Sequence, residues 1–336
     1  MTGELSMSKC LRSLAATLCL ALGSAAPALA QDVPKGDGGT IRMMASPYGS
    51  QSFIPFVIDK FKLDEKYGFE LERIVFSDSK AAAAAVQTGS AEMAIFDWNA
   101  ISLMRNAGVD VIGVAPFITY VSTIVVPTDS PVQGVADLKG KKFGIFSRQS
   151  TDWILVDAAA RNKHGIDLSK ESELQEAAPP LLRGSLEQGR IDATIMFSSI
   201  APDMLASGKF RNAFAIRDVT EELGLPLAPY LMIGTTERYA KEKPENVKAF
   251  VAAYKEVFDI LMKDDSVWEE QGANMKLSGP ALTFYRDQMR RDLLQSFKPE
   301  DNDTLHKTFD VLVATAGTAA LGMEKMPETI LTLDYQ

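Results

Sequence analysis

The sequence predicts an α/β fold of two doubly wound lobes that face each other across a cleft. Short apolar strands alternate with helices along most of the 336 residues, a pattern typical of sheets covered by helices on both faces. An internal repeat at an offset of one hundred residues divides the chain into two similar halves. The length also suffices for two domains of ordinary size.

The repeat relates residues 87–108, QTGSAEMAIFDWNAISLMRNAG, to residues 187–208, EQGRIDATIMFSSIAPDMLASG. Each copy reads as a glycine turn, a short apolar strand and a helix that ends in glycine. Upstream, IRMMASPYGSQSFIPFVIDKF at 41–61 parallels KFGIFSRQSTDWILVDAAARN at 142–162, and both read as strand, polar turn and helix. The offset therefore predicts that equivalent units recur in the two halves.

Each half is expected to fold as β-α-β-α-β. Between the outer units lie the predicted strands FELERIVFSDS and ELQEAAPP and the predicted helices KAAAAAVQTG and LLRGSLEQG. Strands that alternate with helices of this length imply parallel sheets, and such sheets bind ligands at the carboxyl ends of their strands.

Two extended segments, at 118–142 and 224–240, are expected to cross between the halves. Helices predicted within PENVKAFVAAYKEVFDILMK and PALTFYRDQMRRDLLQSF follow the second crossing and are expected to return to the first lobe. The first lobe would then comprise residues 31–118 and 245–336, and the second lobe residues 119–244 together with the crossings.

The first 30 residues are predicted to be a secretory signal peptide. Lys9 and Arg12 precede the apolar run LAATLCLALGSAA, and the cleavage pattern ALA stands directly before Gln31. The run is too short for a membrane span of roughly 20 residues. We therefore expect an exported, soluble protein.

Composition restricts the chemistry and the partners. Cys10 and Cys19 both lie in the predicted signal peptide, so a disulfide or cysteine metal site is not expected after cleavage. The chain carries a net charge of −9, and the first 30 residues carry +1, which leaves −10 for the remainder. An acidic exported protein is a poor partner for nucleic acid. The two histidines, His164 and His306, are predicted to lie at the surface.

The turn at SRQSTDW is not expected to be a nucleophile elbow. Ser147 and Ser150 lack the G-x-S-x-G pattern, and the sequence brings no histidine near them as a base. No phosphate-cradling glycine loop or dinucleotide fingerprint is present in the sequence. We therefore predict a protein that is not an enzyme, with no catalytic residues, no metal site and no cofactor.

The predicted ligand site consists of the turns that follow the strands of both halves, because the carboxyl ends of both sheets would face the cleft. Helix N-termini at these turns favour an anionic group of a ligand, and aromatic residues at the turns and crossings suggest an aromatic wall. The predicted ligand-binding residues are Ser46, Tyr48, Gln51, Ser77, Asp78, Asp97, Trp98, Asn99, Tyr120, Gln149, Ser150, Thr151, Trp153, Phe197 and Ser198.

Several of these residues have a structural alternative that the sequence leaves open. Ser150 and Thr151 are residue types preferred at helix N-caps, and they could also donate to a ligand. Asp97 could cap its own helix or receive a cationic or N–H-bearing ligand. Trp98 and Trp153 could lie in the core or could sandwich a planar ligand.

The ligand class also stays open, because an inorganic anion or a sulfonate usually needs a basic residue. Only Arg148 and Lys80 lie near the predicted turns. A heteroaromatic, pyrimidine-like, amino or sulfonated compound is compatible with the residues.

Three passages carry a resemblance to a known family. TDSPVQGVADLKGKKFGIFSRQST at 128–151 resembles a passage of the type II periplasmic substrate-binding proteins of ABC importers, in particular the nitrate, sulfonate, taurine and thiamine-precursor group. QTGSAEMAIFDWNA at 87–100 and TTERYAKEKPENVKAFVAAY at 235–254 are similar to further passages of that group. Together these passages extend the resemblance over most of the chain after residue 30.

The resemblance implies a Venus-flytrap protein with two lobes joined by a two-strand hinge. It implies a periplasmic solute-binding protein, expected to be a monomer, that captures a small organic molecule, aromatic, heteroaromatic or sulfonate-like. The protein would deliver this molecule to an ABC transporter permease in the inner membrane. A sensor component, or an enzyme like those of pyrimidine synthesis, would share the fold, so the alternatives remain.

Overall fold

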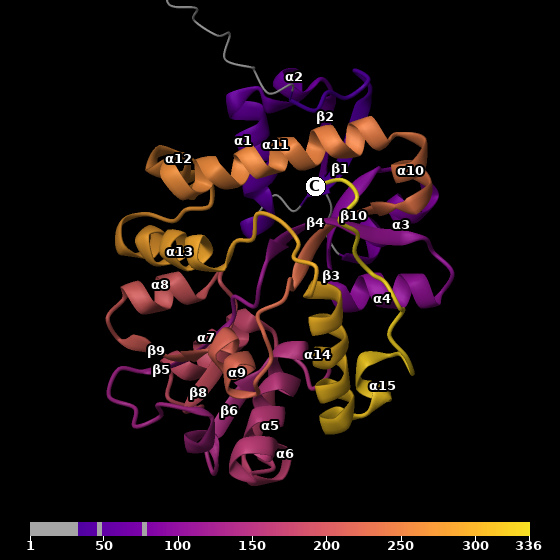
Figure 1. Ribbon diagram of the computed structural model, residues 1–336. Coiled ribbons are helices and arrows are strands. Elements are labelled where there is room, and N and C mark those ends of the chain that lie inside the picture. The colour runs from indigo at the N-terminus through magenta and orange to yellow at the C-terminus, as the bar shows by residue number, and fades with distance from the viewer. Residues whose placement is uncertain (1–32, 46–48, 76–78) are drawn as a thin grey trace, which may run out of the picture. The chain divides into compact units, whose positions relative to one another are not determined.

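The computed structural model describes residues 33–45, 49–75 and 79–336. The compact unit Pro34–Gln336 contains two five-stranded sheets (Figure 1). Outside the described residues lie the predicted signal peptide and four predicted ligand-binding residues, Ser46, Tyr48, Ser77 and Asp78.

The first sheet has the strand order β2-β1-β3-β10-β4. β1 pairs in parallel with β2 and β3, whereas β10 pairs antiparallel with β3 and β4. Its strands are β1 (Thr40–Ala45), β2 (Glu70–Val75), β3 (Met93–Asp97), β4 (Val111–Ile118) and β10 (Leu231–Thr236). The helices between the first four strands are η1 (Ser50–Ser52), α1 (Phe53–Phe61), α2 (Leu63–Tyr67), α3 (Ser79–Thr88) and α4 (Trp98–Asn106).

The second sheet has the strand order β7-β6-β8-β5-β9. β6 pairs in parallel with β7 and β8, whereas β5 pairs antiparallel with β8 and β9. Its strands are β5 (Thr123–Pro127), β6 (Lys142–Ile145), β7 (Glu173–Glu176), β8 (Ala193–Met196) and β9 (Phe210–Ala215). Its helices are η2 (Val135–Leu138), α5 (Thr151–His164), α6 (Leu168–Glu171), α7 (Pro179–Glu187), α8 (Ala201–Ala206) and α9 (Ile216–Glu222).

The two sheets are equivalent in topology, as the repeat predicts. In each sheet three strands from one half of the chain lie in parallel, and one strand from a crossing segment lies antiparallel beside them. The predicted β-α-β-α-β order is confirmed in both halves. The prediction of parallel sheets is correct for β1–β3 and for β6–β8 but wrong for β5 and β10. These two strands enter by crossing from the other sheet, and no helix first returns the chain to the same end.

The C-terminal helices contact elements of both sheets. α11 packs against α1 and α2, whereas α13 packs against α8 and α14 lies beside α5 (Figure 1). These helices were predicted to pack on the first lobe. The prediction agrees with the contacts of α11, but it did not include the contacts of α13 and α14 with helices of the second half. The helices are α10 (Glu237–Glu242), α11 (Pro244–Lys263), α12 (Asp265–Asn274), α13 (Gly279–Asp292), α14 (Asp301–Ala316) and α15 (Thr318–Leu321). The lobe boundaries stay a prediction.

α11 shows how the sequence makes these elements. Pro244 starts the helix, where its missing N–H costs nothing, and apolar residues spaced by three and four positions form one buried face. That face includes Val247, Phe250, Tyr254 and Val257, all fully or almost fully buried. Within the described part of the chain, no helix is both long enough and apolar enough to span a membrane.

Gly144 in β6 is expected to resist substitution. A Cβ at this position would lie 2.7 Å from Thr194 Oγ1 and 2.8 Å from Ile191 Cδ1, closer than real Cβ contacts. We expect Gly144→Ala to lower the free energy of unfolding by about 1–3 kcal/mol, measured by urea denaturation. Gly134→Ala is the control, because a Cβ there meets nothing within 4 Å. Equal urea midpoints for the two variants would contradict this prediction.

Candidate functional site

The predicted ligand-binding residues that the structure describes lie mainly at the carboxyl ends of strands. η1 follows β1 and contains Gln51, and β3 ends at Asp97, directly before Trp98 and Asn99 in α4. The turns after β6 and β8, with the start of α5, hold the residues predicted in the second half, which are Gln149, Ser150, Thr151, Trp153, Phe197 and Ser198.

Asp97 caps α4. Its backbone is extended, and its Oδ1 accepts a hydrogen bond from the backbone N of Ala100 at 2.7 Å. Burial raises the pKa of the Asp97 carboxyl, and hydrogen bonds from backbone N–H groups oppose that rise. No lysine or arginine among the described residues contributes to this pKa. Asp97 therefore caps its own helix, which was one of the two alternatives. No described lysine or arginine balances the charge of its carboxylate.

Tyr120 and Tyr230 form a stacked pair between the two crossing segments. Their ring centroids lie 4.7 Å apart, with an interplanar angle of 24°. Trp98 Nε1 donates to the Tyr120 hydroxyl at 3.2 Å, and the Trp98 backbone N donates to the Tyr230 carbonyl at 3.1 Å. Trp98 is fully buried and Tyr120 almost fully. These contacts connect the start of α4 to both crossings, and contact between Trp98 and a ligand stays a prediction.

Two carboxyl groups act on this stacked pair. Burial raises the pKa of both phenols, and the negative charges of Asp97 and Asp152 raise it further. Asp97 is the last residue of β3 in the first sheet, whereas Asp152 lies in α5 after β6 of the second sheet. The aromatic pair therefore lies within electrostatic range of one carboxyl from each sheet.

Asp152 is a candidate that sequence reasoning missed. Its side chain is buried in the first turn of α5, with 6% of its surface exposed. Burial raises the pKa of Asp152 to about 6, although a hydrogen bond from Ser122 opposes the rise. Its Oδ1 has no hydrogen-bond partner among the described residues. An aspartate in the first turn of a helix is ordinarily explained by the helix dipole, so the sequence carried no signal of its burial.

Ser150 is the N-cap of α5. Its Oγ accepts a hydrogen bond from the Trp153 backbone N at 3.4 Å and donates to the Ser147 carbonyl at 2.9 Å. Gln149 is exposed, and its Oε1 accepts a hydrogen bond from the Ser147 hydroxyl at 2.6 Å. Trp153 is buried and packs against Phe143 in the core. These are structural roles, and contact with a ligand stays a prediction for each of them.

Phe197 and Ser198 follow β8. Phe197 packs edge-on against Phe146, with ring centroids 5.7 Å apart, and Phe146 is 47% exposed. Ser198 is 8% exposed. An aromatic pair with one exposed ring therefore lies at the carboxyl end of the second sheet.

Ser150→Ala is expected to lower the free energy of unfolding by about 1 kcal/mol, because it removes the side chain that caps α5. Urea denaturation measures this loss. Ser150→Asn is the matched variant, because asparagine caps a helix about as well as serine does. Equal stability of the wild type and Ser150→Ala would show that the 3.4 Å contact contributes nothing as a cap.

Some of the buried oxygen atoms without partners belong to these turns or to the first crossing. They are Gln51 Oε1, Asn99 Oδ1, Thr119 Oγ1 and Asp152 Oδ1, and further buried atoms without a partner among the described residues lie elsewhere, in Asp157, Tyr239, Tyr285 and Arg290. Gln51 and Asn99 follow β1 and β3, Thr119 lies in the first crossing, and Asp152 follows β6. Buried polar atoms normally have partners, so each of these atoms calls for an explanation.

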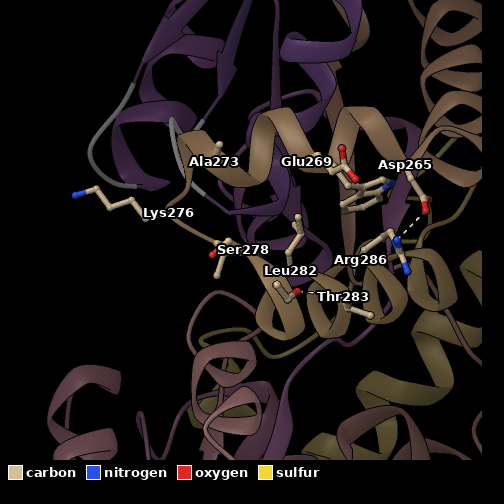
Figure 2. A pocket seen from close by; sticks show the side chains of 11 residues that line it. Asp265, Glu269, Ala273, Lys276, Ser278, Leu282, Thr283 and Arg286 are labelled. Atoms are coloured by element: carbon tan, nitrogen blue, oxygen red, sulfur yellow. Dashed lines mark hydrogen bonds and ion pairs between the residues drawn. The ribbon is translucent and has the colours of Figure 1, made fainter.

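Two hollows of the described structure are lined by residues other than the predicted ones. One hollow of about 560 Å³ lies between α12 and α13, where Arg286 and Asp265 form an ion pair with an N–O distance of 2.8 Å (Figure 2). A second, of about 520 Å³, lies between α13 and the α8–β9 region. The described residues contain no group of three or more histidine, cysteine or acidic side chains placed to hold a metal.

The family comparison gives one match. The family model described as NMT1/THI5 like matches residues 65–266, which is more than half of the chain. No curated protein matches the sequence.

Many solved structures are similar to the chain. The periplasmic aliphatic sulphonate binding protein SsuA of Escherichia coli is 18% identical, with a TM-score of 0.70, over 85% of this chain and 94% of that one. The alkanesulfonate-binding protein SsuA of Xanthomonas axonopodis pv. citri, bound to MOPS, is 17% identical, with a TM-score of 0.67, over 87% and 98%. At such identities the likeness shows the shared fold, and the predicted fold class and family resemblance are confirmed.

Proposed function

Because the chain belongs to the NMT1/THI5-like family, we propose that it is a periplasmic solute-binding protein that captures a small organic molecule and delivers it to an ABC permease. Capture would occur between the carboxyl ends of the two sheets. The solved structures with this fold include periplasmic binding proteins for sulfonates, which supports the binding role and the periplasmic location.

The observation that carries this proposal is the cluster around the two crossings. Trp98, at the start of α4, donates to the Tyr120 hydroxyl and to the Tyr230 carbonyl, and the two tyrosines stack on each other. The charge of Asp152 in α5, which follows β6 of the second sheet, raises the pKa of both phenols. Buried oxygens without partners are found after β1, β3 and β6. A ligand at this place would contact both lobes at once, which is what a protein that closes on its ligand requires.

Closure needs no chemistry on the ligand. A ligand shifts the protein toward the closed state if it binds that state better than the open one. The two crossings would act as the hinge, since a few residues at element ends can absorb the rotation of whole lobes. The closed form would then present a surface to the permease that the open form lacks.

The described side chains favour binding over catalysis at this place. The Ser150 hydroxyl is held by capping contacts to α5. His164 is exposed and lies 2.6 Å from Glu222, at the other end of α5. A serine nucleophile would need a base within hydrogen-bond reach, and these two residues do not form such a pair.

A thermal-shift screen of sulfonates, nitrate, aromatic acids, pyrimidines and amines tests the binding role. We expect at least one compound to raise the melting temperature, because ligand at about 100 times its Kd stabilises the folded state by about 2.7 kcal/mol. The compound should be recovered unchanged after incubation with the protein. Turnover of the compound would reject the binding role, and a screen without any shift would count against it.

Delivery to a permease needs a separate experiment. Cells that lack the gene should lose uptake of the labelled ligand, and the wild-type gene should restore it. If uptake is unchanged but a transcriptional response to the ligand is lost, the protein serves a sensor instead.

A further inference from the structure

We propose that the captured molecule is a small organic cation whose N–H groups lie between the carboxylates of Asp97 and Asp152, beside the Tyr120–Tyr230 pair. This inference rests on the proposed function, under which a small molecule is captured between the carboxyl ends of the two sheets. It specifies the charge of the ligand, which the family and the fold leave undetermined.

The buried aspartates of the protein give the first reason. Asp292 is fully buried, and Arg217 and Arg291 bind it at 2.6 and 2.8 Å. Asp157 is 5% exposed, and Arg161 binds it at 2.9 Å. Asp152 is equally buried, yet its hydrogen bond comes from the neutral Ser122. The Oδ1 atoms of Asp152 and Asp157 both lack a partner among the described residues, but only Asp157 is bound by an arginine through its other oxygen. A buried carboxylate without a cation is costly, so this position is suited to a cation from outside the chain.

The second reason is the position of Asp97, which directly precedes Trp98, the residue that donates hydrogen bonds to the Tyr120 hydroxyl and to the Tyr230 carbonyl. The charges of Asp97 and Asp152 both raise the pKa of Tyr120 and of Tyr230. Asp97 likewise has no described lysine or arginine as partner. One cation near the phenols would therefore be attracted by a carboxylate from each sheet, and it would reduce the repulsion between them as the lobes close.

The third reason is the kind of polar atom that lies without a partner. Gln51 Oε1, Asn99 Oδ1 and Asp152 Oδ1 are all acceptors, and each lies in a turn after a strand or in the helix that follows it. An N–H donor satisfies such atoms, whereas a sulfonate or a carboxylate offers only further acceptors. The stacked tyrosines add a favourable surface, because the face of an aromatic ring attracts a cation.

An anionic ligand would need a basic side chain or N–H donors at this place, whereas the features above are carboxylates and acceptor oxygens. A sulfonate at this place would meet the negative charges of Asp97 and Asp152 without a described basic side chain in contact with either carboxylate. Of the two basic residues near the predicted turns, Arg148 is exposed, and the side chain of Lys80 lies outside those that the structure describes. The described part of the site therefore selects against an anion by repulsion as well as for a cation by attraction.

Matched ligand triplets test the inference. In each triplet one aromatic or alkyl body carries an ammonium, a hydroxyl or a sulfonate group, and benzylammonium, benzyl alcohol and phenylmethanesulfonate form one such triplet. We expect ammonium members to raise the melting temperature and to bind in calorimetry, and sulfonate members to do neither. Asp152→Asn should weaken binding of the ammonium ligand by roughly tenfold or more, because it removes a charge at short range.

Asp203→Asn is the matched control. Asp203 occupies the first turn of α8, the helix that follows β8, and its side chain is 48% exposed. This variant should bind the ammonium ligand as the wild type does. Preferential binding of sulfonate members would overturn the inference and leave the proposed function intact. Absence of binding by every member of every triplet would count against the proposed function itself, and equal binding by Asp152→Asn and the wild type would overturn the role of Asp152.

Discussion

Asp152→Asn is expected to stabilise the ligand-free protein by about 1–3 kcal/mol near pH 8. Burial raises the pKa of this carboxyl from 3.8 to about 6, and each pKa unit corresponds to about 1.4 kcal/mol. The folded protein thus holds the proton more tightly than the unfolded chain, and ionisation of Asp152 costs stability as the pH rises. Asparagine removes that cost while it keeps an oxygen that can accept from Ser122.

The effect of Asp152→Asn on the free energy of unfolding should depend on pH. Below about pH 4 the carboxyl is protonated in both states, so the substitution should have little effect there. The gain should grow between about pH 4 and pH 6 and stay constant above that window. Urea denaturation at several pH values measures it, with Asp203→Asn as the exposed control. A loss of stability at high pH would show that the folded protein provides a compensating partner for the carboxylate.

Asp292→Ala is expected to have the largest effect on stability, a loss of about 3–5 kcal/mol. The Asp292 carboxylate is fully buried, with its Oδ1 2.6 Å from Arg217 Nη1 and its Oδ2 2.8 Å from Arg291 Nη2. Truncation leaves two guanidinium groups without their carboxylate, and the desolvation cost of that charge remains. Because Arg217 belongs to α9 and Asp292 to α13, the loss should also loosen the contact between the C-terminal helices and the second half.

Thermal and urea denaturation measure the loss, with Asp287→Ala as the control in the same helix. Asp287 forms an ion pair with Arg286, but its side chain is 60% exposed, so its removal should cost no more than about 1 kcal/mol. The combination of Asp292→Ala with Arg217→Met should recover part of the stability, because it removes one of the unpaired cations. Similar losses for Asp287→Ala and Asp292→Ala would contradict the assignment of a buried ion pair.

Much of the fold could be predicted from the sequence because its signals are local. Glycine turns, apolar runs and helix starts recur at a fixed offset, and these predicted the three parallel strands of each half. The positions of β5 and β10 could not be predicted in this way. Their apolar patterns show that they are strands, but the choice of partner strand depends on residues about one hundred positions away.

Prediction of the candidate site from the sequence was limited in the same way. The residue types of Asp97 and Ser150 suggested caps, and the structure places both as caps. Asp152 comes within electrostatic range of the aromatic pair only through folding, because Tyr120, Tyr230 and its hydrogen-bond donor Ser122 all lie far from it in the sequence. No periodic pattern in α5 marks Asp152 as special, since the helix is buried over most of its length.

The exchange of β5 and β10 between the sheets also affects how the chain is synthesised. When β3 and β4 leave the ribosome, the strand that belongs between them lies more than one hundred residues further along the chain. Until Leu231–Thr236 emerges, two strand edges of the first sheet remain unpaired and open to pairing with other chains. We therefore expect the nascent chain to be open to wrong pairing at these edges until β10 emerges, whereas the finished protein has β10 between both strands.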